Sequence, residues 1–433
     1  MLDIKYIREN SDQVQQNATD KNIDVDVNQL LLLDEKRRKL TTQVEELRAQ
    51  RNELSSKMGG ATPPDAKDID KSKQLKEKLG SLDEELAKVE TEYLLLLKQV
   101  PNMSSEDTPI GSTEDDNQVL YEKGDKPKFD FAPKNHWEIA LERGWIDKER
   151  AAKVSGARFA YLQGDLVKLQ LALMQYTIDK LTDEEVIVQI INEAGLEGLS
   201  AKPFIPIFPP YMIKTDIYDA MDRLEPSEDR YKIEGEELWL QGSAEHVLGS
   251  MHANETFNED DLPIRYLGYA TSFRKEAGNY GKDMEGIIRM HQFDKLEMEI
   301  LSTADSGLKE HLLTIAVQEH LLRDIDLPYR KLLKCTADIG KPNARGVDMD
   351  VWLPGQGKYC ETHTADFMTD YQARRLATKV RINGKLEFVH TIDATTFACG
   401  RTLVAIIENN QTKDGEVMIP KVLQKYMGGA EKI

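Results

Sequence analysis

The sequence lacks the features that mark membrane-embedded, secreted and disulfide-bonded proteins. No apolar run approaches the roughly 20 residues needed to cross a bilayer. Met1 to Asn10 alternates charged and apolar residues instead of forming a basic cap and an apolar core. The cysteines, Cys335, Cys360 and Cys399, are odd in number and have no close pair. These absences predict a cytoplasmic protein with no membrane segment, no disulfide framework and no structural zinc.

An excess of positive charge is also missing. The 433 residues carry 57 Lys and Arg against 76 Asp and Glu, a formal net charge of −19. This balance argues against a protein that coats nucleic acid non-specifically, since phosphate attraction supplies most of that binding energy, and no DNA partner is expected. Residues 28–100 differ from the rest because they hold 14 basic and 14 acidic side chains.

The segment 28–100 has the clearest periodicity in the chain. Two stripes recur at alternating steps of three and four, as on one side of a helix. They consist of Leu30, Leu33, Arg37, Leu40, Val44, Leu47, Arg51, Leu54 and Met58, and of Leu75, Leu79, Leu82, Leu86, Val89, Tyr93, Leu96 and Val100. Gly59-Gly60 and Pro63-Pro64 separate the stripes and predict an antiparallel hairpin that projects from the body.

A projecting two-stranded coiled coil serves most often as a spacer or as a rod that binds another protein. Contact with nucleic acid is the alternative, and the run Lys36, Arg37, Arg38 and Lys39 offers phosphate ligands. Composition and periodicity leave both uses open.

The chain beyond Pro101 changes to short segments with turn residues. The polar stretch 104–130 predicts a linker, and the domain boundary is expected near residue 110, giving domains 1–110 and 111–433. A helical pattern covers 166–193, and the segment 204–210 is extended and proline-rich. The strand-like runs 238–240, 264–269, 349–353 and 387–390 precede a helix-like run at 402–409. Without parallel βαβ alternation, we expect an α+β fold with an antiparallel sheet flanked by helices.

No Walker loop and no Gly-x-Gly-x-x-Gly motif is present, so phosphate binding would depend on cationic side chains. Residues 273–297 concentrate such side chains with one aromatic ring and several glycines. They include Arg274, Arg289, His291, Phe293 and Lys295, with Gly278, Gly281 and Gly286. Guanidinium groups bind phosphate and carboxylate oxygens bidentately, and a phenyl ring offers a face to a purine. The stretch predicts a site for a nucleoside triphosphate next to a carboxylate.

These residues resemble the signatures of class II aminoacyl-tRNA synthetases, specifically the seryl-tRNA synthetase family. The resemblance covers essentially the whole chain. Residues 273–278 with 289–293 resemble the second signature, and Gly400 to Leu403 with Glu408-Asn409 resemble the third. The serine loop is similar at 242–245 and the metal and ATP segment at 361–364 with 372–375. Further likeness lies at 100–102 and 150–156.

The resemblance implies a ligase that forms an aminoacyl-tRNA ester bond. Serine would attack the α-phosphate of ATP to give seryl-adenylate, and the seryl group would then pass to tRNA(Ser), with tRNA(Sec) as a second acceptor. The products are AMP and pyrophosphate. Magnesium is expected with ATP, held by Glu361 and Thr364. Pro209-Pro210 resembles the dimer-forming first signature, which implies a homodimer.

The resemblance also assigns roles to individual residues. Catalysis is expected from Arg274, Glu276 and Arg401. ATP is expected to bind at Arg274, Lys275, Glu276, Met290, Phe293, Glu361, Thr362, His363, Thr364 and Arg401, with adenine between Phe293 and Arg401. Serine is expected at Ser243, Ala244, Glu245, Arg274, Glu297, Asp393 and Thr395. For His363, a packed and hydrogen-bonded role is expected rather than a catalytic one.

Three positions depart from the usual family pattern. Ser243 stands where the family usually has Thr, and Thr364 where it usually has Ser; both keep a hydroxyl. Asp393 stands where Asn is usual, which removes two donors and adds a negative charge near Glu297. We expect Asp393 either to have a raised proton affinity or to find a cation.

In the family the helical arm reaches the long variable arm of tRNA on the other subunit. The tRNA contacts expected here are Lys36, Arg37, Arg38, Lys39 and Arg51. Arginines within a leucine stripe weaken the seam unless their heads reach solvent or phosphate. Two other functions remain open: a synthetase-like ligase that loads a carrier protein, and a synthetase-like binding protein without catalysis.

Overall fold

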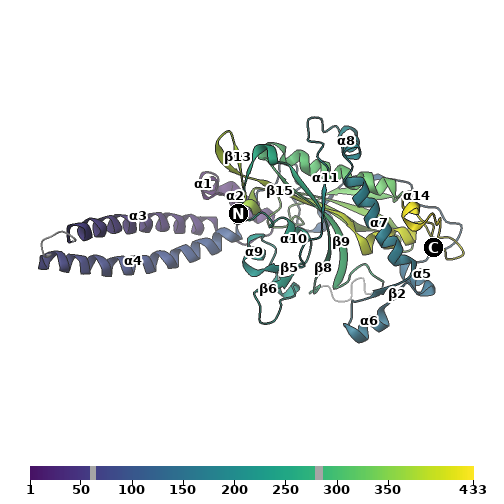
Figure 1. Cartoon of the computed structure of the whole chain (residues 1–433), viewed down its shortest axis with the longest axis horizontal. Coiled ribbons are helices and arrows are strands. Elements are labelled where there is room, and N and C mark those ends of the chain that lie inside the picture. The colour runs from purple at the N-terminus through teal and green to yellow at the C-terminus, as the bar shows by residue number, and fades with distance from the viewer. Residues whose placement is uncertain (59–64, 278–285) are drawn as a thin grey trace. The chain divides into compact units, whose positions relative to one another are not determined.

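The structure is a computed structural model that describes residues 1–58, 65–277 and 286–433. Contacts between residues divide it into two compact units, Met1–Met103 and Ser104–Ile433. None of the described helices is long and apolar enough to cross a membrane. Each unit is built around its own elements (Figure 1).

The first unit is helical. Its elements are α1 (Ile4–Glu9), α2 (Ser11–Asp20), α3 (Val27–Met58) and α4 (Ala66–Gln99). The long helices α3 and α4 run side by side in opposite directions (Figure 1). At roughly 1.5 Å per residue, their 32 and 34 residues make each about 50 Å long. The predicted helical hairpin is confirmed, while the glycines and prolines expected to turn it lie outside the described residues.

The seam between α3 and α4 contains the predicted apolar stripes with two differences. The packed cluster consists of Val44, Leu47, Leu54, Leu75 and Leu79, bordered by Met58, Leu82 and Leu86. Near the end of α4, Leu97 is buried, whereas the predicted Leu96 is half-buried. The other difference is Asp34, a fully buried carboxylate on α3 that no apolar pattern indicates.

In the described part of the second unit, eight strands form one sheet. Their order is β1 (Gln118–Lys123), β10 (Tyr329–Leu333), β11 (Arg345–Leu353), β12 (Lys358–Thr369), β15 (His390–Ala398), β9 (Gln292–Ser302), β8 (Ile264–Phe273) and β4 (Ile205–Ile207). Neighbours are antiparallel except for β4, which pairs with β8 in parallel. The predicted α+β fold with an antiparallel sheet is confirmed.

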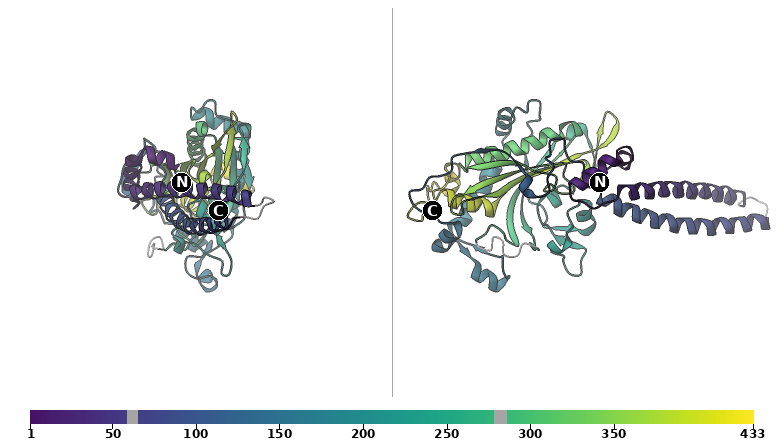
Figure 2. Two further views of the ribbon diagram at one scale, coloured as in Figure 1. Left: turned by 90° about the vertical axis from the view of Figure 1, so that its left-hand side faces the viewer. Right: turned by 180° about the vertical axis from the view of Figure 1, so that it is seen from behind.

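Helices pack against one face of this sheet (Figure 2). The principal ones are α11 (Ala304–Asp324) and α13 (Cys399–Asn409), which share an apolar core with α7 (Asp165–Leu181) and α8 (Glu184–Glu193). The prediction of one continuous helix over 166–193 is therefore wrong. It breaks at Thr182-Asp183 because the Asp183 carboxylate accepts the amide of Glu185 at 2.9 Å and caps a new helix.

The predicted linker 104–130 also differs from the structure, because residues 118–123 form the edge strand β1. Five of its six side chains are exposed and only Tyr121 is half-buried. An edge strand with so little buried surface has no apolar alternation, so its composition matches that of a loop.

Smaller elements complete the second unit. The short strands are β2 (Ile146–Asp147), β3 (Tyr161–Leu162), β5 (Met212–Lys214), β6 (Leu238–Leu240), β7 (Thr256–Asn258), β13 (Lys379–Ile382) and β14 (Lys385–Phe388). The short helices are α5 (His136–Arg143), α6 (Lys148–Val154), α9 (Thr215–Ala220), α10 (Glu245–Leu248), α12 (Tyr371–Leu376) and α14 (Lys421–Gln424). Of these, α10 packs against β9.

The two faces of the sheet differ in chemistry. On β9, Leu296, Met298 and Ile300 belong to the apolar core. The alternate positions on the same strand are Lys295, Glu297 and Glu299. Because side chains alternate across a strand, these polar groups share the opposite face. That face carries the candidate active site.

Candidate active site

A cavity of about 250 Å³ opens at the polar face of the sheet. It is lined from β9, β12 and β15, from the segments that follow β8 and precede β9, and from the start of α13. The lining includes many of the residues predicted to bind substrates, namely Arg274, Glu276, Met290, Phe293, Glu361, Thr362, Thr364, Thr395 and Arg401. Residues more than 120 positions apart in the sequence therefore share one cavity.

Arg274 and Phe293 lie together in this cavity. The guanidinium carbon of Arg274 is 5.4 Å from the centroid of the Phe293 ring. Its Nε donates to the carbonyl oxygen of Gly242 at 2.9 Å, which fixes the side chain against the loop that precedes α10. A flat cation over a flat ring gives a surface suited to a planar base and its phosphates.

Two further arginines line the cavity. Arg401, at the start of α13, donates from Nη1 to the Glu361 carbonyl at 2.7 Å and lies 3.3 Å from the Glu361 carboxylate. Arg289 pairs with Glu276 at 2.5 Å. The cavity thus holds three guanidinium groups, and those of Arg289 and Arg401 pair with carboxylates predicted to bind ATP or its metal.

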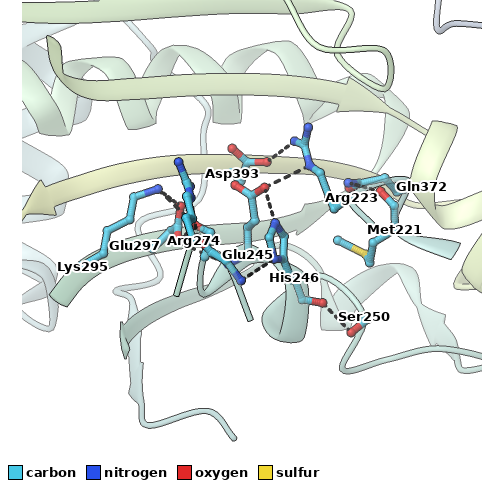
Figure 3. A network of polar contacts seen from close by, with 12 residues as sticks. Met221, Arg223, Glu245, His246, Ser250, Arg274, Lys295, Glu297, Gln372 and Asp393 are labelled. Carbon is cyan, nitrogen blue, oxygen red and sulfur yellow. Dashed lines mark hydrogen bonds and ion pairs between the residues drawn. The ribbon is translucent and has the colours of Figure 1, made fainter. Parts of the chain in front are cut away.

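A buried carboxylate, Glu297, lies on the polar face next to Lys295, which lines the cavity (Figure 3). Its Oε2 accepts the Ser243 hydroxyl at 2.7 Å and the backbone amide of Glu245 at 3.2 Å. Its Oε1 pairs with the ammonium of Lys295 at 2.5 Å. Lys295 also donates to the Ser243 hydroxyl at 3.2 Å. The loop 243–245 and Glu297, predicted to bind serine together, are hydrogen-bonded to one another.

The Asp393 carboxylate pairs with the guanidinium of Arg223, and its pKa is raised. The carboxylate is 1% exposed, and its Oδ2 accepts Nη2 of Arg223 at 3.2 Å. Burial, together with Glu245, raises the pKa of Asp393 well above its ordinary value, while Arg223 opposes the rise. Glu245 lies 2.9 Å from Nε of Arg223. Burial would raise the pKa of Glu245, but Arg223, His246 and Lys295 together outweigh it and hold this pKa well below its ordinary value.

The predicted magnesium ligands lie on β12. A register shift against β11 places Glu361 opposite Asp350, while Thr364 lies opposite Asp348. The Thr364 hydroxyl accepts the ammonium of Lys334 at 3.0 Å. Burial raises the pKa of Asp348 to about 8, although Lys334 opposes the rise at 3.4 Å. These side chains present oxygen donors, the ligand type that magnesium prefers.

Comparison with known proteins explains this arrangement. Residues 1–104 match the family model described as the seryl-tRNA synthetase N-terminal domain, and residues 229–410 match the tRNA synthetase class II core domain (G, H, P, S and T). The serine–tRNA ligase of Exiguobacterium sibiricum is 38% identical over 441 residues, covering 100% of both chains. The chain belongs to the seryl-tRNA synthetase family.

Other members and solved structures agree with this assignment. The serine–tRNA ligase of Deinococcus radiodurans is 37% identical and covers 100% of the chain and 98% of its own. The seryl-tRNA synthetase of Pyrococcus horikoshii, solved with ATP, superposes with a TM-score of 0.87 at 34% identity over 100% of this chain and 99% of that one. A cytoplasmic serine–tRNA ligase of Naegleria fowleri, solved with AMP, gives 0.85 at 28% identity over 100% and 98%.

Not every residue that the family pattern suggests lines the cavity. Those outside its lining are Ser243, Ala244, Glu245, Lys275, Glu297, His363 and Asp393. Lys275 points its ammonium at the Tyr231 ring, 5.5 Å from the centroid. His363 packs edge-on against Phe397 at 5.4 Å, and burial lowers its pKa to about 3. Ala244 is fully buried beneath α10.

The sequence analysis places Arg289 and Lys295 in the predicted nucleotide-binding stretch without giving either an individual role, and it misses Arg223. Lys295 has a signal in the sequence, because it lies between Phe293 and Glu297 at the two-residue period of a strand face. Arg223 has none, because it lies in a loop without a family signature and reaches the site through the fold. Gly278 and Gly281, expected near the phosphates, lie outside the described residues.

The predicted tRNA contacts on α3 already have acidic neighbours. Arg37 and Arg38 each approach the buried Asp34 at 3.2 Å, and Arg8 joins them at 3.1 Å. Arg37 also stacks on Tyr93, 4.4 Å from the ring centroid. The others pair on the surface, Lys36 with Glu85 and Lys39 with Glu35, whereas Arg51 is exposed. Arg37 is therefore stabilised within the seam by the Asp34 carboxylate and the Tyr93 ring.

Proposed function

We propose that this chain activates L-serine with ATP and transfers the seryl group to tRNA. The observation that carries the proposal is a cavity lined by Arg274, whose Nε also donates to the carbonyl oxygen of Gly242 beside the loop 243–245. Phe293 and Arg401 line its nucleotide end. Glu297 and the loop 243–245 do not line the cavity but are hydrogen-bonded to one another, and both Glu297 and Ser243 contact Lys295, which does; they would form the amino-acid end of the site. The full-length relatives named serine–tRNA ligase supply the identity of the amino acid and of the acceptor.

Arg274 is the residue that unites the two substrates. Its guanidinium would contact the serine carboxylate and the α-phosphate together, which holds the nucleophile and electrophile in place and stabilises charge developing on phosphorus. A carboxylate oxygen forms the new bond to phosphorus, and the bond to the leaving pyrophosphate breaks. No general base is required because the nucleophile is already ionised.

The nucleotide would lie along the guanidinium and ring surfaces of the cavity. Adenine would lie between Phe293 and Arg401, and Glu276 with the backbone near Met290 would recognise its edge. The ion pair between Glu276 and Arg289 orients that carboxylate. We assign Lys275 and His363 no direct contact with ATP, since neither lines the cavity.

Magnesium fits the oxygen ligands on β12. Glu361 would contribute a carboxylate oxygen and Thr364 its hydroxyl, whose hydrogen bond from Lys334 leaves a second lone pair. When bound with ATP, the ion neutralises phosphate charge and favours departure of pyrophosphate.

The serine end depends on a network of fixed hydrogen bonds. Glu297 would take the substrate ammonium, and its orientation is set by Ser243 and by the amide of Glu245. Thr395 lies opposite Glu297 in the ladder between β15 and β9 and lines the cavity, so its hydroxyl is placed to meet that of the substrate. Asp393 is two residues away on the same strand face.

The helical hairpin is proposed as the tRNA-binding arm. Four of its basic side chains already form ion pairs, so tRNA phosphates would have to displace the carboxylates of Asp34, Glu35 and Glu85. The basic side chains are Lys36, Arg37, Arg38 and Lys39. Arg51 is exposed. The substrates, ATP and tRNA, are consistent with a cytoplasmic enzyme.

We also propose a homodimer formed beside β4. This strand lies at one edge of the sheet, where unpaired backbone groups favour association. Ile205 and Phe208 are 51% and 71% exposed there, just before Pro209-Pro210. Adjacent exposed apolar side chains at an open edge mark an interaction surface.

Two assays test the proposed function. Serine-dependent exchange between ATP and pyrophosphate is expected for the intact chain, and charging of total tRNA with serine should follow. A binding protein without catalysis would give neither, and a carrier-protein ligase would give only the first. Deleting residues 28–100 should preserve exchange and abolish charging; unchanged tRNA affinity after this deletion would contradict a role for the arm.

A further inference from the structure

Arg223 joins two carboxylates at the proposed amino-acid end of the site. Its Nε lies 2.9 Å from Oε1 of Glu245, and its Nη2 donates to Oδ2 of Asp393 at 3.2 Å. Nη2 also approaches Oδ1 of Asn343 at 3.4 Å. The Arg223 side chain is 15% exposed, so the group is nearly withdrawn from water. Figure 3 shows the guanidinium beside both carboxylates, with a dashed line to each.

The surroundings of Arg223 are unusually acidic. In the ladders, Asp393 on β15 lies between Asp366 on β12 and Glu299 on β9. Glu297 is two residues from Glu299 on the same strand face. Among the described residues, Oδ1 of Asp393 and both oxygens of Glu299 have no hydrogen-bond partner. So many buried carboxylates repel one another unless a cation lies among them.

Glu245 connects this arginine to the proposed serine site. Its side chain pairs with Arg223, while its backbone amide donates to Oε2 of Glu297 at 3.2 Å. A change in the position of Glu245 therefore moves the amide that orients Glu297. Asp393 provides the second connection, because it shares a strand face with Thr395. Arg223 thus contacts both walls of the amino-acid end.

We propose that Arg223 is a positioning residue for amino-acid binding, which compensates the charge of Asp393 and holds Asp393 and Glu245 in the orientation that serine requires. This inference rests on the proposed function. It explains how the chain tolerates a carboxylate where the family usually has an amide: Arg223 supplies the donors that Asn would have carried. Arg223 acts through its neighbours and is not assigned a contact with the substrate.

A double-mutant cycle tests the pair. In R223Q, Asp393 and Glu245 lose their shared cation, so the KM for serine in the exchange reaction should rise about tenfold or more, while the KM for ATP stays within about twofold. In the R223Q background, D393N removes the uncompensated charge and should bring the serine KM back to within about threefold of D393N alone.

The controls separate positioning from folding. Arg223→Lys keeps the charge but not the planar fork, so its serine KM should lie between those of the unaltered chain and R223Q. Lys341→Gln removes an ion pair with the adjacent Asp222, 2.7 Å long, and should leave the serine KM unchanged. Should R223Q fail to fold, the comparison of R223K with R223K/D393N gives the same readout.

The outcomes distinguish this inference from the proposed function. Absence of serine-dependent exchange in the unaltered chain would overturn the proposed function. Normal exchange, with equal rises of the serine and ATP KM values in R223Q or with no recovery on adding D393N, would overturn the role of Arg223 alone.

Discussion

Replacing Glu299 with glutamine should change how the stability of the second unit depends on pH. Glu299 is fully buried on β9, and neither of its oxygens has a hydrogen-bond partner among the described residues. Burial, reinforced by Asp393, Glu245 and Glu297, raises its pKa well above the ordinary value, against the opposing effect of Arg223. The native state therefore keeps a proton that the unfolded chain releases.

The sign and size of the effect follow from this difference in proton binding. Below the ordinary pKa of 4.5 both states are protonated, so Glu299 adds no dependence on pH. As the pH rises from there toward the native pKa, the unfolded state gains about 1.4 kcal/mol per pH unit relative to the native state. For the 330 residues from Ser104 to Ile433, this corresponds to roughly 2 °C in Tm per pH unit.

Thermal unfolding at pH 5.5, 6.5 and 7.5 measures this slope in the unaltered chain and in E299Q. The Tm of the variant relative to the unaltered chain should increase at each step, because glutamine does not titrate. A constant offset is expected in addition, since a buried amide leaves its own donors unpaired. A difference in Tm that does not change with pH would show that Glu299 is ionised in the native state.

Three further variants probe the nucleotide end. Arg274→Lys keeps the charge but loses the bidentate fork, and exchange should slow about 10²- to 10³-fold with normal thermal unfolding; a change below threefold would remove Arg274 from the chemistry. Phe293→Ala should raise the KM for ATP about 5- to 150-fold through lost stacking, whereas Phe293→Tyr should leave it nearly unchanged; equal effects would argue against stacking. Glu361→Gln should raise the magnesium concentration for half-maximal exchange, and an unchanged magnesium dependence would contradict its role as a ligand.

The sequence predicts those parts of the fold in which one face of an element is apolar. The stripes of α3 and α4 and the strand β11 have such faces, so their periodicity is visible. Elements without one were mispredicted. Residues 118–123 bury almost nothing, and the break at Thr182-Asp183 depends on one capping carboxylate within an otherwise helical pattern.

For the candidate site, the sequence predicted the residues that belong to recognisable strings. Arg274, Phe293 and Glu361 are of this kind, and the structure brings them to one cavity. The partners of Asp393 and Thr364 could not be predicted. Arg223 and Lys334 come from distant segments and meet these residues through pairing of strands and packing of loops, which no local pattern encodes.

The position of a bound intermediate analogue would test the central role of Arg274. A crystal structure with a non-hydrolysable seryl-adenylate analogue should place the Arg274 guanidinium within hydrogen-bond distance of both the seryl carbonyl and the phosphate substitute. The ammonium should lie at Glu297 and the adenine against Phe293. An analogue bound with its seryl group away from Glu297, or without contact to Arg274, would contradict serine activation in this cavity.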